Sequence, residues 1–341
     1  MIAIKFYTDK TLITDKNRKR IFPLFLDIFF LNNTELSSYF VFEEDIKKAD
    51  LAIFPIDITY LYKKRKEKTV HEFIETCRKN NLKTWLYSGG DIGKTINKKN
   101  VIVFRLGGFN SKMNTDTQII PSFVQDPYAT ILNRPFTVLQ KNEKPQIGFV
   151  GHANGSIKGI LHEFTVFLYL LKEIFLKNFY FDFQPFFPSG YYRYKILQTI
   201  LKNNKVDSNF IFRANYTGGT QQQGAIKEST YQFYENIEQN PYVFCMRGLG
   251  NFSVRFYETL IMGRIPVVPR SNMRLPLHQI INWEKHCVFV NSNSFAEDLL
   301  TFHNSISNED FEKMQNNNRN LALNQLTRIG YFKEHYKQFF A

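Results

Sequence analysis

The densest group of residues that could do chemistry lies between Cys245 and Pro269, in CMRGLGNFSVRFYETLIMGRIPVVP. Arg247 follows an apolar run, and Gly248 and Gly250 let the backbone turn tightly and approach a ligand. We expect a helix to begin near Ser253, with its unpaired N–H groups and the positive end of its dipole directed at the same place. An arginine, two glycines and a helix N-terminus together favour an anion, above all a diphosphate.

Helical spacing sorts the side chains between residues 254 and 261 onto two faces. The apolar face is expected to pack on a sheet and carries Val254, Tyr257 and Ile261. The polar face is expected to turn towards the ligand and carries Arg255, Glu258 and Thr259. Arg255 would lie near the phosphates, and Glu258 would accept hydrogen bonds from vicinal hydroxyls such as those of a ribose. The same spacing fits an Arg–Glu pair on a solvated helix, which contributes less than ~1 kcal/mol to stability.

The elements that must position this stretch are short apolar runs that alternate with longer amphipathic segments, as in parallel sheets flanked by helices. In the first half, such runs predict strands at residues 2–8, 49–56, 83–88 and 101–106. Apolar residues at helical spacing predict a helix over residues 70–80. The polar, proline-bounded segment 134–145 is the predicted linker.

The pattern restarts after the linker. Residues 146–156 predict a strand and a glycine-containing turn, and residues 159–175 a strongly apolar helix. Further strands are predicted at 209–215, 242–247, 264–269 and 286–290. The tail over 310–341 predicts helix, with breaks at 316–318 and Gly330.

We therefore predict an α/β protein with two Rossmann-like domains that face each other across a cleft, where such architectures bind ligands. The predicted N-terminal domain covers residues 1–140, and the C-terminal domain covers residues 141–325. A helical tail over residues 326–341 is expected to pack back on the N-terminal domain.

Chain length, composition, net charge and cysteine content limit the class of protein. With 341 residues and 43% hydrophobic content, the chain can fill two cores. The net charge of +13 suits polyanions, anionic membrane surfaces or phosphorylated small molecules, and charge alone does not choose among them. Three cysteines without CxxC spacing indicate neither a disulfide framework nor a zinc site, and they favour a reducing compartment. The apolar run 22–31 is too short to cross a bilayer, so we expect neither a signal peptide nor an anchor.

Charged and metal-binding patterns elsewhere in the chain are weak. The basic runs at 62–68 and 97–100 predict solvated faces, with contact to an anionic membrane surface as the alternative. Basic residues are dispersed and no RNA-binding or helix-turn-helix signature occurs, so we expect no nucleic-acid partner. The seven histidines show no metal-ligand spacing.

The stretch that begins at Arg247 resembles the signature block of the exostosin family of glycosyltransferases. In that family the pattern runs R-G-x-G-x-x-S-x-R-x-x-E, then G-x-I-P-V, then L-P and a tryptophan before the next strand. Weaker similarity lies at 147–151 and 212–219, and the first domain matches in style only. The matching positions in this chain are Arg247, Gly248, Gly250, Ser253, Arg255, Glu258, Gly263, Ile265, Pro266, Val267, Leu275, Pro276 and Trp283.

The resemblance implies an enzyme of the two-domain GT-B type, bacterial or viral and cytoplasmic. It would bind a nucleoside-diphosphate sugar, UDP being expected, in the C-terminal domain and an acceptor in the N-terminal domain. The acceptor would be a glycan or a lipid-linked glycan of surface-polysaccharide synthesis, with peripheral contact at the inner face of the membrane. The implied substrate-binding residues are Arg213, Asn215, Arg247, Gly248, Gly250, Asn251, Ser253, Arg255 and Glu258. Arg270 and Arg274 follow in a loop that reaches either the donor or solvent.

Transfer from such a donor requires stabilisation of the leaving diphosphate by a divalent metal or by fixed positive groups. The sequence contains no Asp-x-Asp triplet, the usual metal-holding feature of the alternative glycosyltransferase fold. We therefore expect Arg247, Arg255 and the helix N-terminus to replace the metal, and we expect no cofactor.

The family is associated with inversion at the sugar carbon, which requires a general base on the acceptor hydroxyl. Asp91 in YSGGDIG is the first choice, Asp57 in FPIDITY the second and Asp126 in PSFVQDPYAT the third. Each aspartate also fits a turn or a helix cap, and for any single one of them that interpretation is favoured. His152 in GHANG follows a strand of the C-terminal domain, where it would contact acceptor or phosphate, or belong to a plain turn.

Two other functions stay open on the sequence. A non-catalytic protein that binds polyanions or nucleic acid would use the net charge of +13. A nucleotide enzyme of another class, such as an epimerase or a phosphatase, would use the same diphosphate site for another reaction.

Overall fold

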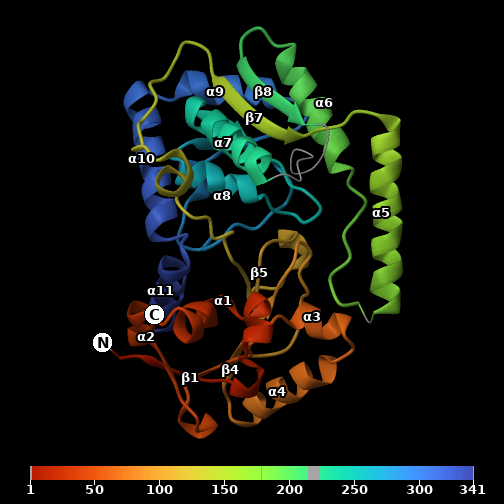
Figure 1. Ribbon diagram of the computed structural model, residues 1–341, viewed down its shortest axis with the longest axis vertical. Helices are drawn as coiled ribbons and strands as arrows, with labels where there is room; N and C mark the ends of the chain where they lie inside the picture. The colour runs from red at the N-terminus through yellow and green to blue at the C-terminus, as the bar shows by residue number, and fades with distance from the viewer. Residues whose placement is uncertain (1, 178, 214–222, 341) are drawn as a thin grey trace.

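The computed structural model describes residues 2–177, 179–213 and 223–340, and Figure 1 shows two α/β halves stacked along the longest axis. Within these residues, the N-terminal half contains six parallel strands in the order β2-β1-β3-β4-β5-β6. Its strands are β1 (Ile4–Tyr7), β2 (Phe40–Phe42), β3 (Leu51–Ile53), β4 (Lys83–Ser88), β5 (Val101–Arg105) and β6 (Thr117–Ile119). Its helices are α1 (Pro23–Phe25), α2 (Thr34–Tyr39), α3 (Ile58–Lys63) and α4 (Glu67–Lys79).

The C-terminal half repeats the arrangement with a parallel sheet in the order β11-β10-β9-β7-β8. Its strands are β7 (Gln146–His152), β8 (Asp207–Arg213), β9 (Tyr242–Phe244), β10 (Ile265–Pro269) and β11 (Val288–Val290). The helices after β7 are α5 (Ile157–Leu176), α6 (Ser189–Leu201), α7 (Gln223–Gln239), α8 (Val254–Ile261), α9 (Phe295–Ser305), α10 (Asn308–Asn324) and α11 (Arg328–Phe339).

These sheet orders confirm the two predicted Rossmann-like domains. In each sheet the second strand of the half lies at one edge and the later strands extend from the other side of the first, which is the doubly wound order. Strands covered by helices on both faces are built from continuous apolar runs. The segments YVF of β9 and IPVVP of β10 are such runs, and every residue in them is buried.

The end of the chain packs back on the N-terminal half, as the sequence predicted. Helix α11 crosses to α1 and α2, beside the first sheet (Figure 1). Its Arg328 pairs through Nε with Oδ2 of the buried Asp27 at 2.6 Å. The Tyr331 hydroxyl donates to the carbonyl of Ile119 at 2.9 Å, at the end of β6.

The predicted breaks in the tail were wrong. Helix α10 continues through residues 316–318, and Gly330 lies inside α11. The chain turns at residues 325–327 instead, because the Thr327 hydroxyl accepts a hydrogen bond from the Gly330 N–H at 3.1 Å and so caps a new helix.

The cysteines and the lengths of the helices can also be compared with the sequence predictions. Cys77, Cys245 and Cys287 are buried free thiols. None of the helices in the described ranges combines the length and the apolar character needed to cross a bilayer.

Candidate active site

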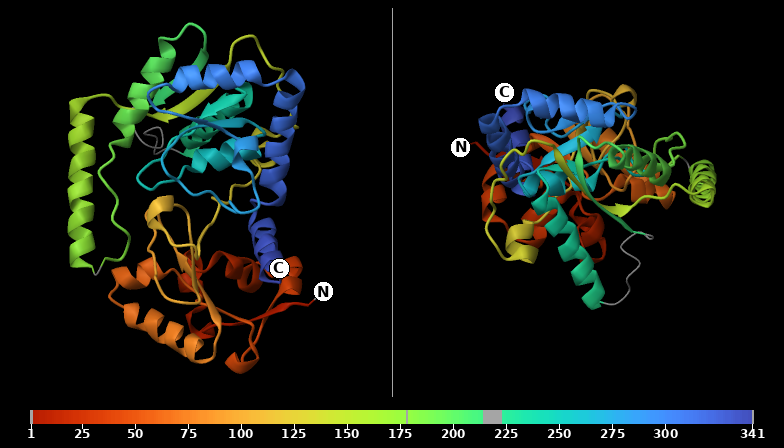
Figure 2. Two further views of the ribbon diagram at one scale, coloured as in Figure 1. Left: turned by 180° about the vertical axis from the view of Figure 1, so that it is seen from behind. Right: turned by 90° about the horizontal axis from the view of Figure 1, so that it is seen from above.

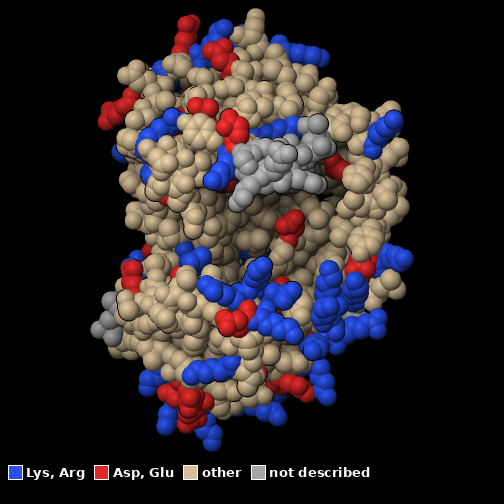
Figure 3. All heavy atoms as spheres, viewed as in Figure 1, with Lys and Arg blue, Asp and Glu red and all other residues tan. Residues whose placement is uncertain are grey.

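A cavity of about 810 Å³ lies at the carboxyl ends of β7 and β9. The strand order reverses between these two strands, and open α/β sheets bind their ligands at such a point. Figure 3 shows the hollow between the two halves of the molecule. The C-terminal half supplies most of the wall, and Asp91 of the N-terminal half stands among the lining residues.

Arginines 193, 213 and 255 stand on the wall of this cavity. Arg255 donates from Nη2 to the carbonyl of Val150 at 2.6 Å, and its guanidinium lies 4.5 Å from the centroid of the Phe149 ring. A Cβ atom at position 151 would stand 2.9 Å from the same nitrogen, so the Gly151 position has little room for a larger residue. These contacts fix the Arg255 guanidinium before any ligand binds.

The other two arginines are also held by backbone oxygens. Arg193 of α6 is 7% exposed and donates from Nη1 to the carbonyl of His152 at 2.7 Å. Arg213, the last residue of β8, donates from Nη2 to the carbonyl of Ser229 at 2.7 Å. Burial lowers the pKa of Arg213. An anion placed among these guanidinium groups would regain part of the solvation that burial removed.

Helix α8 begins at Val254, as predicted, and its first residues line the cavity. Ser253 precedes it in an extended conformation, and the Ser253 side chain makes no capping hydrogen bond with the described residues. The N–H groups of the first turn are therefore directed at the cavity without that usual side-chain acceptor.

The predicted sorting of α8 into two faces holds only in part. Val254 is 46% exposed and lines the cavity, although we predicted it to face the sheet. Thr259, predicted on the ligand side, is fully buried, and its hydroxyl lies 3.4 Å from Sγ of Cys245. Tyr257 and Ile261 are buried as predicted. The helix is thus rotated about its own axis relative to our expectation, so that Val254, Arg255 and Glu258 line the cavity.

Glu258 lies at the deeper end of this row. Its Oε1 atom accepts a hydrogen bond from the Tyr234 hydroxyl at 3.3 Å. Burial raises the pKa of Glu258, and the positive charge of Arg255 opposes that rise. A carboxylate accepts several hydrogen bonds, so Glu258 can take a ligand hydroxyl besides Tyr234.

Arg247 lies elsewhere than we predicted. Its side chain is 4% exposed and is outside the residues that line the cavity. The guanidinium lies 4.9 Å from the ring centroid of Phe109 and 4.6 Å from that of Phe187, and Nη2 donates to the carbonyl of Leu249 at 3.0 Å. Burial lowers the pKa of Arg247 to about 10. In this arrangement the Arg247 side chain lies between rings of the two halves and does not line the cavity.

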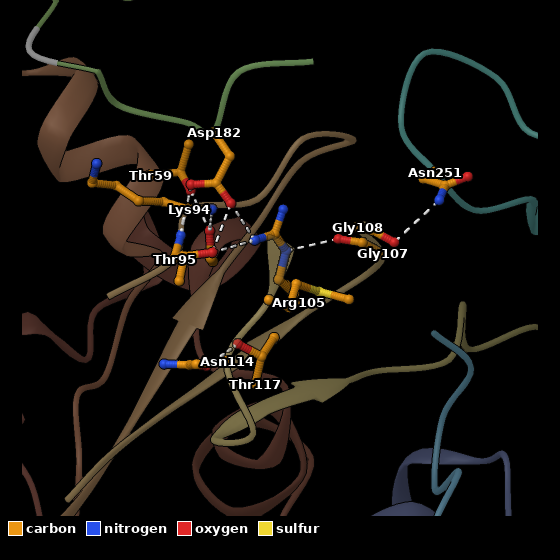
Figure 4. A network of polar contacts seen from close by, with 12 residues as sticks. Thr59, Lys94, Thr95, Arg105, Gly107, Gly108, Asn114, Thr117, Asp182 and Asn251 are labelled. Carbon is orange, nitrogen blue, oxygen red and sulfur yellow. Dashed lines mark hydrogen bonds and ion pairs between the residues drawn. The ribbon is translucent and has the colours of Figure 1, made fainter. Parts of the chain in front are cut away.

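Residues 250 and 251 also join the halves. A Cβ atom on Gly250 would stand 1.9 Å from the carbonyl oxygen of Asp91, so the backbones of the two halves touch here. Asn251 is 1% exposed and donates from Nδ2 to the carbonyl oxygen of Gly108 at 3.2 Å (Figure 4). It also donates to the carbonyl oxygen of Ser271 at 2.8 Å. Gly248 and Gly250 line the cavity, whereas the Asn251 side chain does not.

An ion pair between the buried Arg105 and the partly exposed Asp182 was not predicted. Arg105, at the end of β5, is 1% exposed and donates from Nη1 to Oδ2 of Asp182 at 2.6 Å and from Nε to the carbonyl of Gly107 at 2.7 Å (Figure 4). Asp182 belongs to the segment between α5 and α6, and its other oxygen accepts from the N–H of Thr95 at 2.9 Å. This network ties a segment of the C-terminal half to the N-terminal sheet.

Of the predicted general bases, Asp91 and His152 line the cavity. Asp91 has an exposed side chain, and partial desolvation raises its pKa. His152 Nδ1 lies 3.3 Å from the carbonyl oxygen of Arg213. Because a carbonyl only accepts, this contact requires the proton on Nδ1, and Nε2 is then the basic nitrogen of the neutral ring.

Asp57 and Asp126 are outside the cavity wall and have structural partners. Asp57 caps α3, since its Oδ1 accepts from the N–H groups of Thr59 and Gly89, both at 2.8 Å. Asp126 pairs with Arg319 of α10 through two hydrogen bonds of 2.8 and 2.7 Å. The turn or cap interpretation that the sequence left open therefore describes both residues, since Oδ1 of Asp126 also accepts from the N–H of Tyr128 at 3.1 Å.

Three residues named from the sequence remain, namely Asn215, Arg270 and Arg274. Asn215 lies outside the described residues. Arg274 donates from Nη1 to the carbonyls of Asn114 and Thr117, so it binds the N-terminal half. The Arg270 guanidinium lies 5.3 Å from the ring centroid of Phe289.

Part of the wall was not predicted from the sequence and comes from α6 and α7, namely Arg193, Ser229, Thr230, Phe233 and Tyr234. No motif marks these positions, because long-range packing brings them to the strand ends. For metal binding, the described residues hold no group of three or more His, Cys, Asp or Glu side chains that could bind an ion.

No family model and no curated protein matches the sequence. Among solved structures, a glycosyltransferase from Rickettsia africae ESF-5 aligns with 100% of this chain and 99% of its own, at 13% identity and a TM-score of 0.38. A variant of S. aureus TarM in complex with fondaparinux, alpha-GlcNAc-glycerol and UDP aligns with 85% of this chain and 55% of its own, at 10% identity and a TM-score of 0.37. Sucrose-phosphate synthase from Thermosynechococcus elongatus aligns with 86% of this chain and 74% of its own, at 9% identity and a TM-score of 0.36. At these scores the fold assignment rests on the two sheet orders themselves.

Proposed function

We propose that this chain is a glycosyltransferase that moves a sugar from a nucleoside-diphosphate sugar, with UDP as the expected nucleotide, to a hydroxyl group of an acceptor. One observation carries the proposal. A cavity at the reversal point of the second sheet presents Arg193, Arg213, Arg255 and the N-terminus of α8 from one half, and Asp91 from the other. The similarity of the stretch after Arg247 to the exostosin signature supports the same reaction.

The donor would bind along α8. Its diphosphate would accept hydrogen bonds from the Arg255 and Arg213 guanidinium groups and from the first N–H groups of the helix, which are fixed in place before binding. Glu258 would accept the ribose hydroxyls, and the Phe233 ring on the same wall would contact the base. Fixed positive charge would stabilise the leaving diphosphate, so the proposal includes turnover without a metal.

The transfer step would be a direct displacement. The acceptor oxygen attacks the anomeric carbon, the bond from that carbon to the diphosphate oxygen breaks, and the nucleoside diphosphate leaves with the electron pair. Asp91 would take the proton of the acceptor hydroxyl, since it faces the donor wall from the opposite half and its raised pKa strengthens it as a base. Inversion at the sugar carbon would follow from this single displacement.

We further propose that the acceptor is a glycan or a lipid-linked glycan, and that the enzyme works in the cytoplasm on surface polysaccharide. The expected assignment of donor to the C-terminal half and acceptor to the N-terminal half fits this scheme.

A calorimetric panel tests the proposal first. UDP should bind the full chain with a Kd in the micromolar range, about −8 kcal/mol, and EDTA should leave both that Kd and the turnover of UDP-sugars unchanged. A chain that retains heparin or nucleic acid but binds no nucleoside diphosphate would support the polyanion-binding alternative. Product analysis separates transfer from epimerisation or phosphate release, because only transfer yields UDP together with a glycosylated acceptor.

A further inference from the structure

Helix α5 exposes an apolar stripe along its outer face. The stripe consists of Ile157, Leu161, Phe164, Leu168 and Phe175, which are between 41% and 75% exposed. Their spacing of four, three, four and seven residues keeps them on one side of the helix. Figures 1 and 2 show α5 at the edge of the molecule, outside both sheets. Contiguous exposed apolar surface of this kind marks an interaction site.

The charged residues of α5 are sorted by sign. Lys158 and Lys172 are exposed. The two acidic residues point inward: Glu163 accepts a hydrogen bond from the Gly190 N–H at 2.9 Å, and the buried Glu173 pairs with Lys177. The exposed charges of the helix are therefore positive.

A basic cluster, which we define as Lys63, Lys64, Arg65, Lys66 and Lys68, lies against the end of α5. All five side chains are exposed. Arg65 donates from Nη2 to the carbonyl of Leu176, the last residue of the helix, at 2.9 Å. Figure 3 shows lysine and arginine side chains gathered below the hollow, on the side of the molecule where α3 and the end of α5 lie.

We infer that the apolar stripe of α5 and the basic cluster form a docking surface for an anionic lipid bilayer. Interfacial helices bury Leu and Phe side chains at the acyl boundary while lysines contact the headgroups, and each lysine or arginine near an anionic surface adds to binding. Charge complementarity selects the bilayer over a second copy of this chain, because two such surfaces placed face to face would bring positive charges together.

The inner face of α5 connects this surface to the proposed active site. A second cavity of about 460 Å³ lies between α5 and residues 181–187, with mostly apolar walls. Within it the Gln184 side chain is 8% exposed, and its Oε1 atom has no hydrogen-bond partner among the described residues, so it can accept from a ligand. His152 and Leu249 line both cavities. Docking would thus bring a lipid-linked acceptor to the donor cavity. This delivery of the acceptor rests on the proposed function, whereas the docking itself does not.

Vesicle flotation of the full chain tests the inference. Vesicles of phosphatidylcholine with phosphatidylglycerol should carry the protein, vesicles of phosphatidylcholine alone should carry much less, and 0.5 M NaCl should weaken the binding, because screening shortens the range of the charges. Leu161→Glu and Leu168→Glu should each lower the partition coefficient about tenfold or more. The double change Lys64→Glu and Lys66→Glu should lower it about tenfold or more on anionic vesicles.

Two substitutions on α10 control for the general effect of a new negative charge on the surface. Leu323→Glu and Lys313→Glu change the same residue types at exposed positions and should leave vesicle binding unaltered. The inference is overturned if anionic vesicles do not bind the wild type, or if Leu161→Glu binds as well as Leu323→Glu. It is also overturned if light scattering shows a dimer that Leu161→Glu dissociates. UDP binding by calorimetry tests the proposed function separately, since the stripe and the basic cluster are outside the first cavity.

Discussion

Replacing Arg255 by methionine is the sharpest perturbation of the proposed donor site. Methionine keeps most of the length of the side chain but removes the guanidinium that Val150 and Phe149 hold at the cavity wall. A hydrogen bond between charged groups contributes about 1.5–3 kcal/mol, so the Kd for UDP should rise roughly 10- to 150-fold. Arg213 and the N-terminus of α8 remain, which keeps the loss within this range.

Isothermal titration calorimetry with UDP and with uridine separates this effect from damage to the fold. Arg255→Met should weaken UDP binding by the stated factor and leave uridine binding within about twofold, because uridine carries no phosphate. Arg20→Met is the matched control. Arg20 is exposed, and its guanidinium lies 4.1 Å from the Tyr60 ring centroid in the N-terminal half.

Loss of the Arg255 contacts with the Phe149 ring also lowers stability by about 0.5–2 kcal/mol, so circular dichroism must show that the variant is folded at the assay temperature. If folded Arg255→Met binds UDP within twofold of the wild type, the diphosphate is not held at this wall and the reasoning is refuted. Equal losses for UDP and uridine would refute it as well, because they would point to a general distortion of the cavity.

Single substitutions at Gly250, Asp91 and His335 test three other features of the structure. Gly250→Ala should lower the free energy of unfolding by about 1–3 kcal/mol in a denaturant titration, because the new Cβ atom would stand 1.9 Å from the Asp91 carbonyl oxygen. Unchanged stability would mean that the two halves do not touch there. Asp91→Asn should reduce kcat about 100-fold or more and leave the Kd for UDP unchanged. In the wild type, kcat should fall on acidification as Asp91 is protonated, with a pKa that partial desolvation raises above its ordinary value. A variant whose kcat is near that of the wild type would show that Asp91 is not the base. Burial lowers the pKa of His335 to about 3, whereas the unfolded chain protonates it near 6.5. Between the unfolded and the folded pKa, the protein should therefore lose about 1.4 kcal/mol of stability per pH unit of acidification from this group alone. His335→Leu should flatten that slope, and equal slopes in the two proteins would contradict the buried neutral imidazole.

Most of the sheet scaffold could be predicted from the sequence, because buried parallel strands leave a simple apolar signal. The runs at β4, β5, β9 and β10 were all recognised. The edge strands β2 and β6 were missed, since each has only three residues and is fixed by pairing with β1 or β5 over a long sequence separation. A run as short as FVF or TQI carries no periodicity of its own.

Only the general location of the candidate site could be predicted from the sequence. Spacing placed Arg255 and Glu258 together on one face of α8, and both residues line the cavity. It did not show that Arg247 would turn towards Phe109 and Phe187, because those rings come from segments more than fifty residues away in the sequence. Arg193 lies on the wall without any motif, held there by its hydrogen bond to the carbonyl of His152 at the end of β7. Residue type and local period identify which side chains can bind an anion, but tertiary contacts decide which of them do.

The most direct test of the central claim is a crystal structure of the full chain with UDP. We expect the diphosphate to lie at the N-terminus of α8, within hydrogen-bond distance of the Arg255 and Arg213 guanidinium groups, with the ribose hydroxyls near Glu258. UDP bound anywhere else on the molecule, with this cavity empty, would contradict it.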